Sequence, residues 1–237
     1  MIKTSVAGTE TTVMAIRHLI LALLTTPRAY RKLQAEIDAY YYSNSSSSSQ
    51  TKTNTNTNTN PNPNPSPNPN SKETKTKTIP YADTKSLPYL QASIRETLRL
   101  WPPSASMLSK EVPPSPSPSH PQNEYKLHGY HLPPGTAIGQ HLYAVGRHRG
   151  TWGEDADVFR PERWLEAASF AASAASLEGE TGKDGKEGKD GGGEGDGGKR
   201  LKEMQAANDI VFSSGKYLCL GKSIALMEIG KFFCEVC

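Results

Sequence analysis

The sequence predicts a mainly α-helical fold with small β-sheets, of the α+β class, and two observations lead to this prediction. Apolar residues recur at helical spacing in three separate blocks of the chain. Between the second and third blocks, residues 125–143 read as two extended segments around the turn signal Pro133-Pro134-Gly135. Because the helical blocks are longer than the extended segments, helices should dominate the fold.

Two helices are predicted between Met1 and Tyr42. The first should end near Thr26, because Pro27 follows and cannot continue it. Thr26 and Pro27 are also typical of the N-cap and first turn of a second helix. The apolar residues at helical spacing are Ile2, Val6, Val13, Ile16, Leu19, Ile20, Leu23 and Leu24 in the first helix, and Tyr30, Leu33, Ile37 and Tyr40 in the second.

The remaining elements follow from the same two patterns. A helix is predicted over residues 87–101, where apolar residues repeat at intervals of three and four until Pro102 ends the pattern. Residues 125–132 should form a strand, and residues 136–143 a returning strand or an extended segment. The last helix should start near Leu220.

Three stretches of biased composition interrupt these elements. Residues 43–78 are rich in Ser, Thr, Asn and Pro, residues 113–123 in Pro and Ser, and residues 178–200 in Gly with charges of both signs. None can bury enough apolar surface to offset the entropy lost on ordering. We predict that all three are loops or disordered insertions within a single domain spanning residues 1–237.

Charge and cysteine content exclude several classes of protein. The net charge of +3, from 27 basic and 24 acidic residues, gives no surface of the kind that binds nucleic acid. The 3 cysteines all follow residue 218, so no disulfide framework is expected, and no signal peptide opens the chain. The longest apolar run, residues 13–24, includes Arg17 and His18 and is too short to span a bilayer. We therefore expect no membrane anchor in this chain.

The strongest chemical signal is FSSGKYLCLG at residues 212–221, which an apolar helix follows. Gly215 permits a tight turn before the cysteine, and Gly221 lets a flat partner approach closely. Cys219 lies at the start of a helix, where free N–H groups favour a thiolate, which is a good ligand for iron. Taken alone, a buried structural cysteine would be the better interpretation.

A second motif, AGTETT at residues 7–12, places a glycine, an acid and three hydroxyls inside the first helix. A glycine in a helix costs about 1 kcal/mol relative to alanine. Threonine hydroxyls can bond to the preceding turn and bend the helix. The motif could therefore open a groove for a ligand, although a polar helix start is the alternative.

Two further motifs carry charge. Glu96 and Arg99 lie three residues apart on one helix face, and FRPERW at residues 159–164 supplies Arg163 in an aromatic setting. An exposed Glu96–Arg99 pair would contribute only about 0.2–0.5 kcal/mol. If Arg163 reached Glu96, the three charges would form a buried network, which costs about 3–5 kcal/mol to break.

Taken in this order, the four motifs resemble the cytochrome P-450 family of heme-thiolate monooxygenases. The resemblance rests on AGTETT, ETLR, FRPERW and FSSGKYLCLGKSIA, and covers nearly all of the chain outside the biased stretches. The sequence of residues 87–103 and 215–222 resembles that of filamentous-fungal members of the family. This resemblance implies a role in secondary metabolism. The implied fold is the C-terminal half of that family's fold.

The resemblance implies a function for the whole. It implies that the Cys219 thiolate is the ligand of heme b iron and that this thiolate promotes O–O cleavage. The reaction is the insertion of one oxygen atom of O₂ into a small hydrophobic organic substrate, by C–H hydroxylation. Electrons come from NADPH through a flavoprotein reductase. A full-length member lies at the cytosolic face of the endoplasmic reticulum membrane.

The same resemblance implies roles for single residues. Ala7 and Gly8 line the oxygen-binding face of the heme, Glu10 and Thr11 relay protons, and residues 104–108 line the substrate pocket. Glu96, Arg99 and Arg163 fix the cysteine loop. The other residues implied at the heme are Lys110, Phe212, Gly215, Lys216, Tyr217, Gly221 and Ala225.

One departure from the family concerns the heme carboxylates. Tyr217 stands where members have an Arg or His that pairs with a heme propionate. Lys216 could substitute for that residue, less rigidly than Arg. Lys110 stands where another propionate-pairing Arg is expected.

A second departure concerns length. The match begins at the oxygen-binding helix and ends inside the helix after Cys219. We therefore expect a truncated product, a fragment or an incomplete gene model that folds poorly and is inactive on its own. A compact, protease-resistant core with bound heme would contradict this expectation.

Two alternatives to the monooxygenase are open. A zinc or redox module would use the CxxC motif of Cys234 and Cys237 with histidines between His120 and His148, although their spacing fits no zinc site. A non-catalytic remnant or binding protein would keep the motifs without a working heme. Metal analysis distinguishes the first alternative, and a carbon-monoxide difference spectrum the second.

Overall fold

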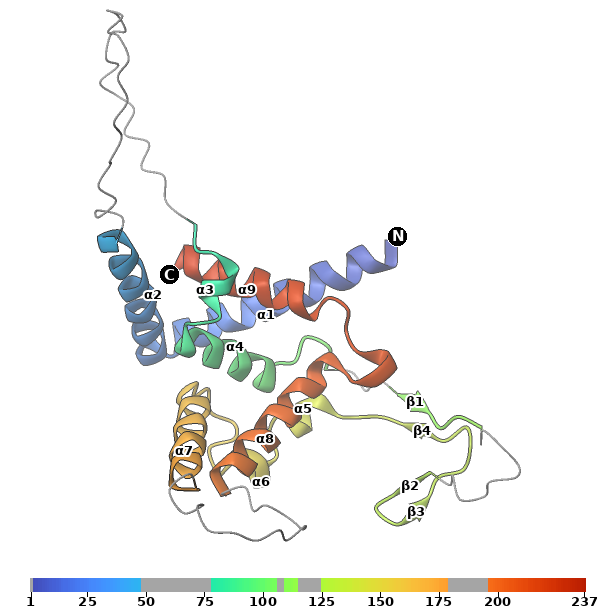
Figure 1. Cartoon of the computed structure of the whole chain (residues 1–237). Coiled ribbons are helices and arrows are strands. Elements are labelled where there is room, and N and C mark those ends of the chain that lie inside the picture. The colour runs from blue at the N-terminus through green and yellow to red at the C-terminus, as the bar shows by residue number, and fades with distance from the viewer. Residues whose placement is uncertain (1, 48–77, 106–108, 115–124, 179–195) are drawn as a thin grey trace, which may run out of the picture.

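A computed structural model describes residues 2–47, 78–105, 109–114, 125–178 and 196–237. The chain is mainly helical with two small antiparallel sheets, so the predicted fold class is confirmed (Figure 1). The helices are α1 (Ile2–Thr25), α2 (Pro27–Ser47), α3 (Tyr81–Thr84), α4 (Pro88–Leu100), α5 (Leu142–Val145), α6 (Arg149–Trp152), α7 (Glu162–Glu178), α8 (Asp196–Asp209) and α9 (Lys222–Val236), with short 3₁₀ helices η2 (Ile210–Phe212) and η3 (Gly215–Tyr217).

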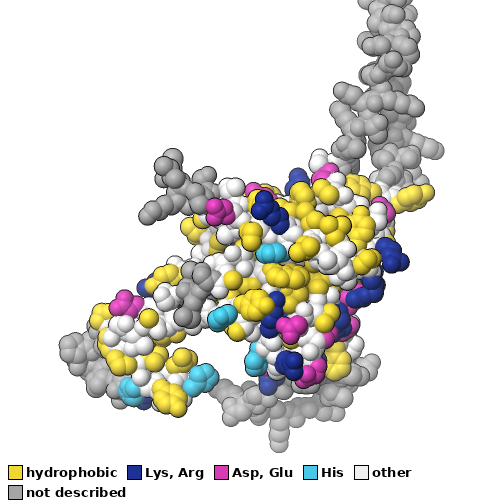
Figure 2. Space-filling view, turned by 180° about the vertical axis from the view of Figure 1, so that it is seen from behind, with side chains coloured by type: hydrophobic (Ala, Val, Ile, Leu, Met, Phe, Trp, Pro, Cys, Tyr) yellow, Lys and Arg dark blue, Asp and Glu magenta, His cyan; other side chains and the backbone are white. Residues whose placement is uncertain are grey.

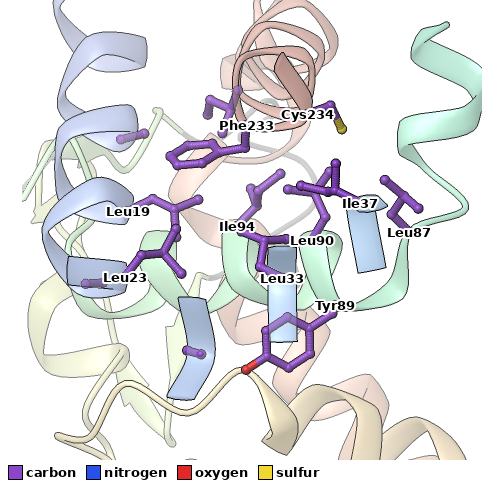
Figure 3. Close-up of a cluster of buried hydrophobic side chains, with 14 of the residues drawn as sticks. Leu19, Leu23, Leu33, Ile37, Leu87, Tyr89, Leu90, Ile94, Phe233 and Cys234 are labelled. Atoms are coloured by element: carbon purple, nitrogen blue, oxygen red, sulfur yellow. The ribbon is translucent and has the colours of Figure 1, made fainter. Parts of the chain in front are cut away.

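A first hydrophobic core joins α1, α2, α4 and α9 (Figure 3). Leu19 from α1, Leu33 from α2 and Leu90 from α4 are fully buried there, and Phe233 of α9 packs against them. The break between α1 and α2 falls at Thr26, as Pro27 predicted. The two helices can therefore fold back on each other and cover α4.

A carboxylate on α2 holds the start of α4. The backbone N–H groups of Tyr89 and Leu90 donate to Glu36 Oε1 and Oε2 at 2.8 and 2.9 Å. Two free N–H groups at a helix N-terminus are thereby satisfied by a neighbouring helix. Burial raises the pKa of Glu36, and the two backbone hydrogen bonds offset part of that increase.

A second, smaller core lies where α4, α6, α7 and α8 meet. Trp152 and Trp164 are buried at its centre, with ring centroids 5.5 Å apart, and Met204 of α8 packs against them. Ala92 on α4 belongs to the same cluster. Because α4 contributes to both cores, it fixes the two halves of the molecule relative to each other.

The predicted strand over residues 125–132 is wrong, because the chain turns back in its middle. β2 (Lys126–Leu127) pairs with β3 (Tyr130–His131) as a tight hairpin. His128 and Gly129 between them have φ values of 50° and 84°, the signature of a two-residue turn with both central residues left-handed.

The returning segment also pairs differently from the prediction. β4 (Ala137–Ile138) pairs with β1 (Lys110–Glu111) and not with residues 125–132. The turn signal at Pro133-Pro134-Gly135 is real: Gly135 has a φ of 82°, and Thr136 N donates to Pro133 O at 3.1 Å. Sequence reasoning found the turn but not the partner, since β1 is only two residues long.

The biased stretches lie mostly outside the described residues, but helices extend into two of them. α2 continues to Ser47 and α8 begins at Asp196, so the ends of the predicted loops at 43–78 and 178–200 are wrong by several residues. A helix that is already packed extends at little cost, because each added residue gains a hydrogen bond. The rest of those two stretches and most of 113–123 are not described.

The sequence predicted no membrane anchor, and one segment of the described residues is a weak candidate for a membrane span. Residues 7–25 of α1 are long and apolar enough by length and composition. Yet α1 packs against α2, α4 and α9, and its Leu19 lies in the first core. A core helix of a soluble protein satisfies the same criterion, so this is weak support for a membrane span.

Candidate functional site

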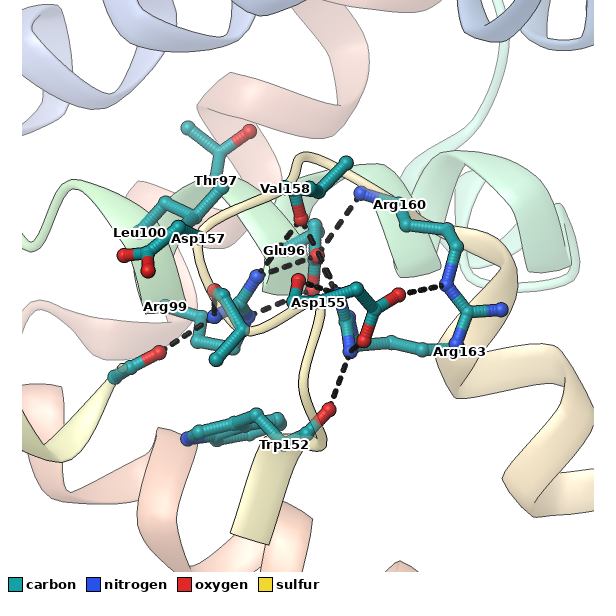
Figure 4. Close-up of polar contacts among 12 residues, drawn as sticks. Glu96, Thr97, Arg99, Leu100, Trp152, Asp155, Asp157, Val158, Arg160 and Arg163 are labelled. Carbon is teal, nitrogen blue, oxygen red and sulfur yellow. Dashed lines mark hydrogen bonds and ion pairs between the residues drawn. The ribbon is translucent and has the colours of Figure 1, made fainter. Parts of the chain in front are cut away.

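Glu96 of α4 is the centre of a buried charge network (Figure 4). Its Oε1 accepts from Arg99 at 2.7 Å, from Arg163 at 2.8 Å and from the backbone N–H of Arg160 at 3.0 Å. Its Oε2 accepts from Arg99 at 3.0 Å and from the indole N–H of Trp164 at 3.0 Å. The Glu96 and Arg99 side chains are 0% exposed and that of Arg163 is 1% exposed, so a buried charge is compensated on all sides.

The two arginines use their other N–H groups to tie down the segment between α5 and α7. Arg99 donates to the carbonyls of Gly146 and Ala156. Arg163 donates to Trp152 O at 2.7 Å and to Asp155 Oδ1 at 3.1 Å. The network therefore converts an irregular stretch of backbone into a rigid layer against α4.

Asp155 takes part in the same layer. Burial raises the pKa of this carboxyl, but hydrogen bonds and positive charge from Arg163 and Arg160 outweigh it, so its pKa lies below the usual range. Asp155, Arg160 and Trp164 were not among the predicted network residues. The signal was available, because Arg160 and Trp164 belong to the FRPERW motif.

The network reaches the cysteine segment through the second core. Trp164 donates to Glu96 and packs with Met204 of α8, and α8 leads directly into η2 and the loop that carries Cys219. That Glu96, Arg99 and Arg163 fix the cysteine loop stays a prediction, and the described contacts offer only an indirect route for it. It runs through a packed tryptophan and a helix.

The loop of residues 210–221 is closed at its base. Cys219 N donates to Phe212 O at 2.9 Å, and Lys222 Nζ pairs with Asp209 Oδ1 at 3.0 Å across the two ends. Phe212 also packs against the first core. The loop is therefore held to the body of the molecule at its base, while residues 214–220 are exposed to solvent.

Backbone conformation inside this loop is unusual at two positions. Gly215 has a φ of 58°, in the left-handed region that its tight turn requires. Ser213 has a φ of 61° and a ψ of −169°, a combination that is nearly confined to glycine and costs about 1–3 kcal/mol for other residues. Nothing in the sequence pattern indicated this strain, because the residue is a serine.

The outer part of the loop is exposed. Cys219 is a free, exposed cysteine, and Leu220 beside it is 98% exposed. A Cβ added to Gly221 would meet only Cys219 Sγ, at 3.9 Å, and one added to Gly215 would meet nothing within 4 Å. Cys219 is thus accessible, and its two sequence neighbours, Leu218 and Leu220, are exposed apolar residues.

Lys110 of β1 lies beside this loop, next to the loop residues Lys216 and Tyr217. The Nζ of Lys110 on β1 is 5.0 Å from the centre of the Tyr217 ring, and that of Lys216 is 5.1 Å from it. Three residues expected at the heme carboxylates are thereby brought together from two distant parts of the chain.

The AGTETT motif lies on an exposed part of α1. Ala7, Gly8, Glu10 and Thr11 are all exposed, and a Cβ at Gly8 would meet nothing within 4 Å. Thr11 Oγ1 donates to Ala7 O at 2.7 Å, the bond to the preceding turn that was predicted. Figure 1 places this end of α1 on the same side of the molecule as the segment before α9. Helix α1 packs against α9 itself.

Exposed apolar side chains continue along α1 and α9. Leu21 and Leu24 on α1 and Ile224 on α9 are each more than half exposed. Figure 2 shows hydrophobic side chains gathered over the helical part of the face seen from behind. Of the predicted pocket residues, Ser104 is partly buried and Ala105 exposed, and residues 106–108 lie outside the described part.

The zinc alternative has no support in the described residues. No group of three His, Cys, Asp or Glu side chains within the described ranges could hold a metal ion. Burial raises the pKa of Cys234 to about 12, so this thiol is neutral at pH 7 and a poor metal ligand. The CxxC motif is better explained as the packed end of α9.

Comparisons with known proteins agree with the four motifs. The family model for cytochrome P450 matches residues 1–55 and 70–236. Cytochrome P450 monooxygenase ABA1 of Pyricularia oryzae (strain 70-15) is 32% identical over 231 residues, which are 98% of this chain and 32% of the relative. Cytochrome P450 monooxygenase aba1 of Botryotinia fuckeliana is 29% identical over 231 residues, which are 98% and 32% of the two chains. Cytochrome P450 monooxygenase cfoH of Aspergillus candidus is 27% identical over 226 residues, which are 95% and 30%.

The chain therefore spans 30–32% of the length of these relatives, all of them fungal. The match nevertheless includes the buried Glu96–Arg99–Arg163 network and the Cys219 loop. On these grounds the chain belongs to the cytochrome P450 family.

Proposed function

We propose that this chain forms the heme-binding part of a monooxygenase, with Cys219 as the iron ligand. The observation that carries the proposal is an exposed thiol on a loop that is fixed at its base and open at its outer side. When bound, heme b activates O₂ for insertion of one oxygen atom into a small hydrophobic substrate, of the C–H hydroxylation type, with electrons from NADPH through a flavoprotein reductase.

The residues around Cys219 fit a flat, largely apolar group. Gly221 leaves the thiol side of the loop without a side chain, and Leu218, Leu220 and Ile224 expose apolar surface there. Covering such surface is favourable because apolar area leaves water. A porphyrin lying over this segment would be held by contact with the loop and the first turn of α9, which contains Ala225.

The loop residues orient the thiol. The backbone bond from Cys219 N to Phe212 O fixes where the cysteine leaves the loop, and Phe212 anchors that bond to the first core. The Asp209–Lys222 pair holds the ends of the loop together. Preorganisation of this kind lets the ligand bind without first ordering its own backbone.

On α1, Thr11 and Glu10 are proposed to handle protons. Thr11 Oγ1 places its hydroxyl hydrogen on Ala7 O, so its lone pairs are free to accept a hydrogen bond from outside the helix. The exposed carboxylate of Glu10 lies at the adjacent position and can exchange protons with solvent. Ala7 and Gly8 leave room beside them, since neither carries a large side chain.

The wider role is proposed from the relatives. They are fungal monooxygenases, which favours a reaction in secondary metabolism at the cytosolic face of the endoplasmic reticulum. Because the chain spans 32% of the first relative, we propose that it acts as part of a longer fold and does not turn over substrate alone. Incubation with a reductase, NADPH and candidate substrates should yield no hydroxylated product, and catalytic turnover would contradict this part of the proposal.

The heme proposal is tested by the carbon-monoxide difference spectrum of the full chain titrated with hemin and reduced. A strongly red-shifted Soret band, absent in Cys219→Ser, is the expected result. Cys237→Ser is the matched control, since it removes another partly accessible thiol, and it should leave the band unchanged. An identical spectrum for the parent chain and Cys219→Ser would contradict thiolate ligation at this position.

A further inference from the structure

We infer that Tyr217 is a positioning residue that holds Lys110 and Lys216 as a pair of cations for the two carboxylates of heme. This inference deepens the proposed function and rests on it. It assigns to an uncharged tyrosine the task of arranging two flexible ammonium groups. In this arrangement Lys110 and Lys216 bind the heme carboxylates.

The geometry places both cations on one ring. Lys110 comes from β1 and Lys216 from η3, and their Nζ atoms lie 5.0 and 5.1 Å from the Tyr217 ring centre. Both distances are within the range of about 6 Å in which a cation is attracted to an aromatic face. The one ring is thus a shared contact for both ammonium groups.

Neither ammonium group has a carboxylate partner among the described residues. Among the described residues, the contacts shown for these two ammonium groups are those with the Tyr217 ring. Lys222, by contrast, also lies 5.2 Å from a ring, that of Phe212, but pairs with Asp209 at 3.0 Å. The pair on Tyr217 is therefore positive charge that no described carboxylate neutralises.

The nearest acid in the sequence is turned away from the pair. Glu111 follows Lys110 on β1, and successive side chains of a strand point to opposite faces. A Cβ on Gly135 would lie 3.5 Å from Glu111 Oε1, which places that carboxylate beside the turn before β4. Lys110 remains available to an incoming anion.

A lysine is a poor substitute for arginine unless it is held. The lysine ammonium group is a point charge at the end of a flexible side chain. Fixing it costs more side-chain entropy per hydrogen bond than fixing the rigid guanidinium of arginine. Contact with Tyr217 would restrict both stems before the heme arrives. Lys216 lies three residues before Cys219, so one of the two cations belongs to the same loop as the proposed iron ligand.

The experiment compares hemin with hemin dimethyl ester, which has no carboxylate charge, by titration of the full chain followed by Soret absorbance. The parent chain should bind hemin ~10-fold more tightly than the ester at low salt, since two partly exposed charge pairs are lost. The preference should fall in 0.5 M salt, which screens exposed charges. Lys110→Met with Lys216→Met should abolish it.

Variants of Tyr217 separate positioning from charge. Tyr217→Phe keeps the aromatic face and should keep the preference for hemin, whereas Tyr217→Leu should lose most of it with both lysines intact. An unchanged preference in Tyr217→Leu would show that the ring positions nothing. Equal affinity for hemin and the ester in the parent chain would overturn the inference as a whole.

The Soret position keeps the two proposals distinguishable. If the parent chain discriminates poorly against the ester but its reduced carbon-monoxide complex has a red-shifted band that depends on Cys219, only the lysine–tyrosine inference fails. If no ligand spectrum depends on Cys219, the proposed function fails first. Circular dichroism of each variant checks that the helices are retained.

Discussion

The Glu96 network and the Cys219 loop, two regions that the family motifs single out, are opposite in physical character. Glu96 is buried and accepts five hydrogen bonds from four residues, so its charge is compensated within the chain. Residues 214–220 of the loop are all exposed, and they include Lys216 and the apolar side chains of Leu218 and Leu220. The comparison shows that the network is complete in itself, whereas the loop presents a surface that suits an external partner.

The largest effect is expected at the centre of the network. Glu96→Gln removes the carboxylate while Arg99 and Arg163 stay buried, so Arg99 loses its paired carboxylate and Arg163 keeps only Asp155. We expect the free energy of unfolding to fall by about 3–5 kcal/mol, measured by urea denaturation.

Glu203→Gln on the exposed side of α8 is the matched control, because it makes the same chemical change in solvent. It should alter stability by less than about 0.5 kcal/mol. Similar losses in the two variants would show that the network does not differ from a surface charge.

Gly146, inside the layer that the network holds, and Gly8, on the exposed part of α1, should respond oppositely to an added methyl group. A Cβ on Gly146 would lie 2.0 Å from the backbone oxygen of Arg99, so Gly146→Ala must push the rigid layer off α4. We expect a loss of about 1–3 kcal/mol in the same denaturation experiment. Gly8→Ala, where the added Cβ meets nothing within 4 Å, should instead stabilise α1 by up to about 1 kcal/mol.

An acid-sensitive cluster lies at the edge of the network. Tyr89, Lys32 and Arg28 donate to Glu162 Oε1. Burial raises the pKa of Glu162, but hydrogen bonds from these residues and from its own backbone outweigh this and lower it from 4.5 to about 2. Glu162→Gln should destabilise the chain by about 1–2 kcal/mol at pH 7.

The sign of its pH dependence follows from the lowered pKa. The carboxylate contributes its full stability above pH 4.5 and loses it as the pH falls toward 2, because the unfolded state binds the proton first. Urea denaturation between pH 5 and pH 2 should therefore show a shallower acid limb for Glu162→Gln than for the parent chain. Parallel curves would refute the assignment of this carboxylate.

The smallest effect is expected in the loop. Ser213 adopts a φ of 61° and a ψ of −169°, which glycine accepts more readily. Ser213→Gly should stabilise the chain because it removes this backbone strain. The gain should be about 1 kcal/mol or less, since glycine also raises the entropy of the unfolded state. Destabilisation would mean that the serine side chain contributes more than its backbone strain costs.

Sequence reasoning succeeded where local patterns carry the information. Proline and apolar spacing predicted the break at Thr26 and the end of α4 near Trp101, and motif order predicted the family. It failed where pairing is non-local: the two-residue strand β1 has no readable pattern, and its pairing with β4 depends on the tertiary fold.

The same limit applies to the site. The sequence predicted that a contact between Arg163 and Glu96 would create a buried network, because both motifs were recognisable, and the structure shows this contact. The contact of Lys110 with Tyr217 could not, because a lysine over 100 residues away in sequence has no spacing rule that links it to a ring. The family resemblance located the residues, and only the fold showed which of them touch.

A rigid network is thus proposed to support an open loop that a heme completes. Amide hydrogen exchange of the full chain with and without hemin tests it most directly. Residues 88–100 should exchange slowly in both states, and residues 212–221 should exchange fast alone and slow markedly with hemin, but not in Cys219→Ser. Exchange in residues 212–221 that hemin leaves unchanged, or slows equally in Cys219→Ser, would contradict the account.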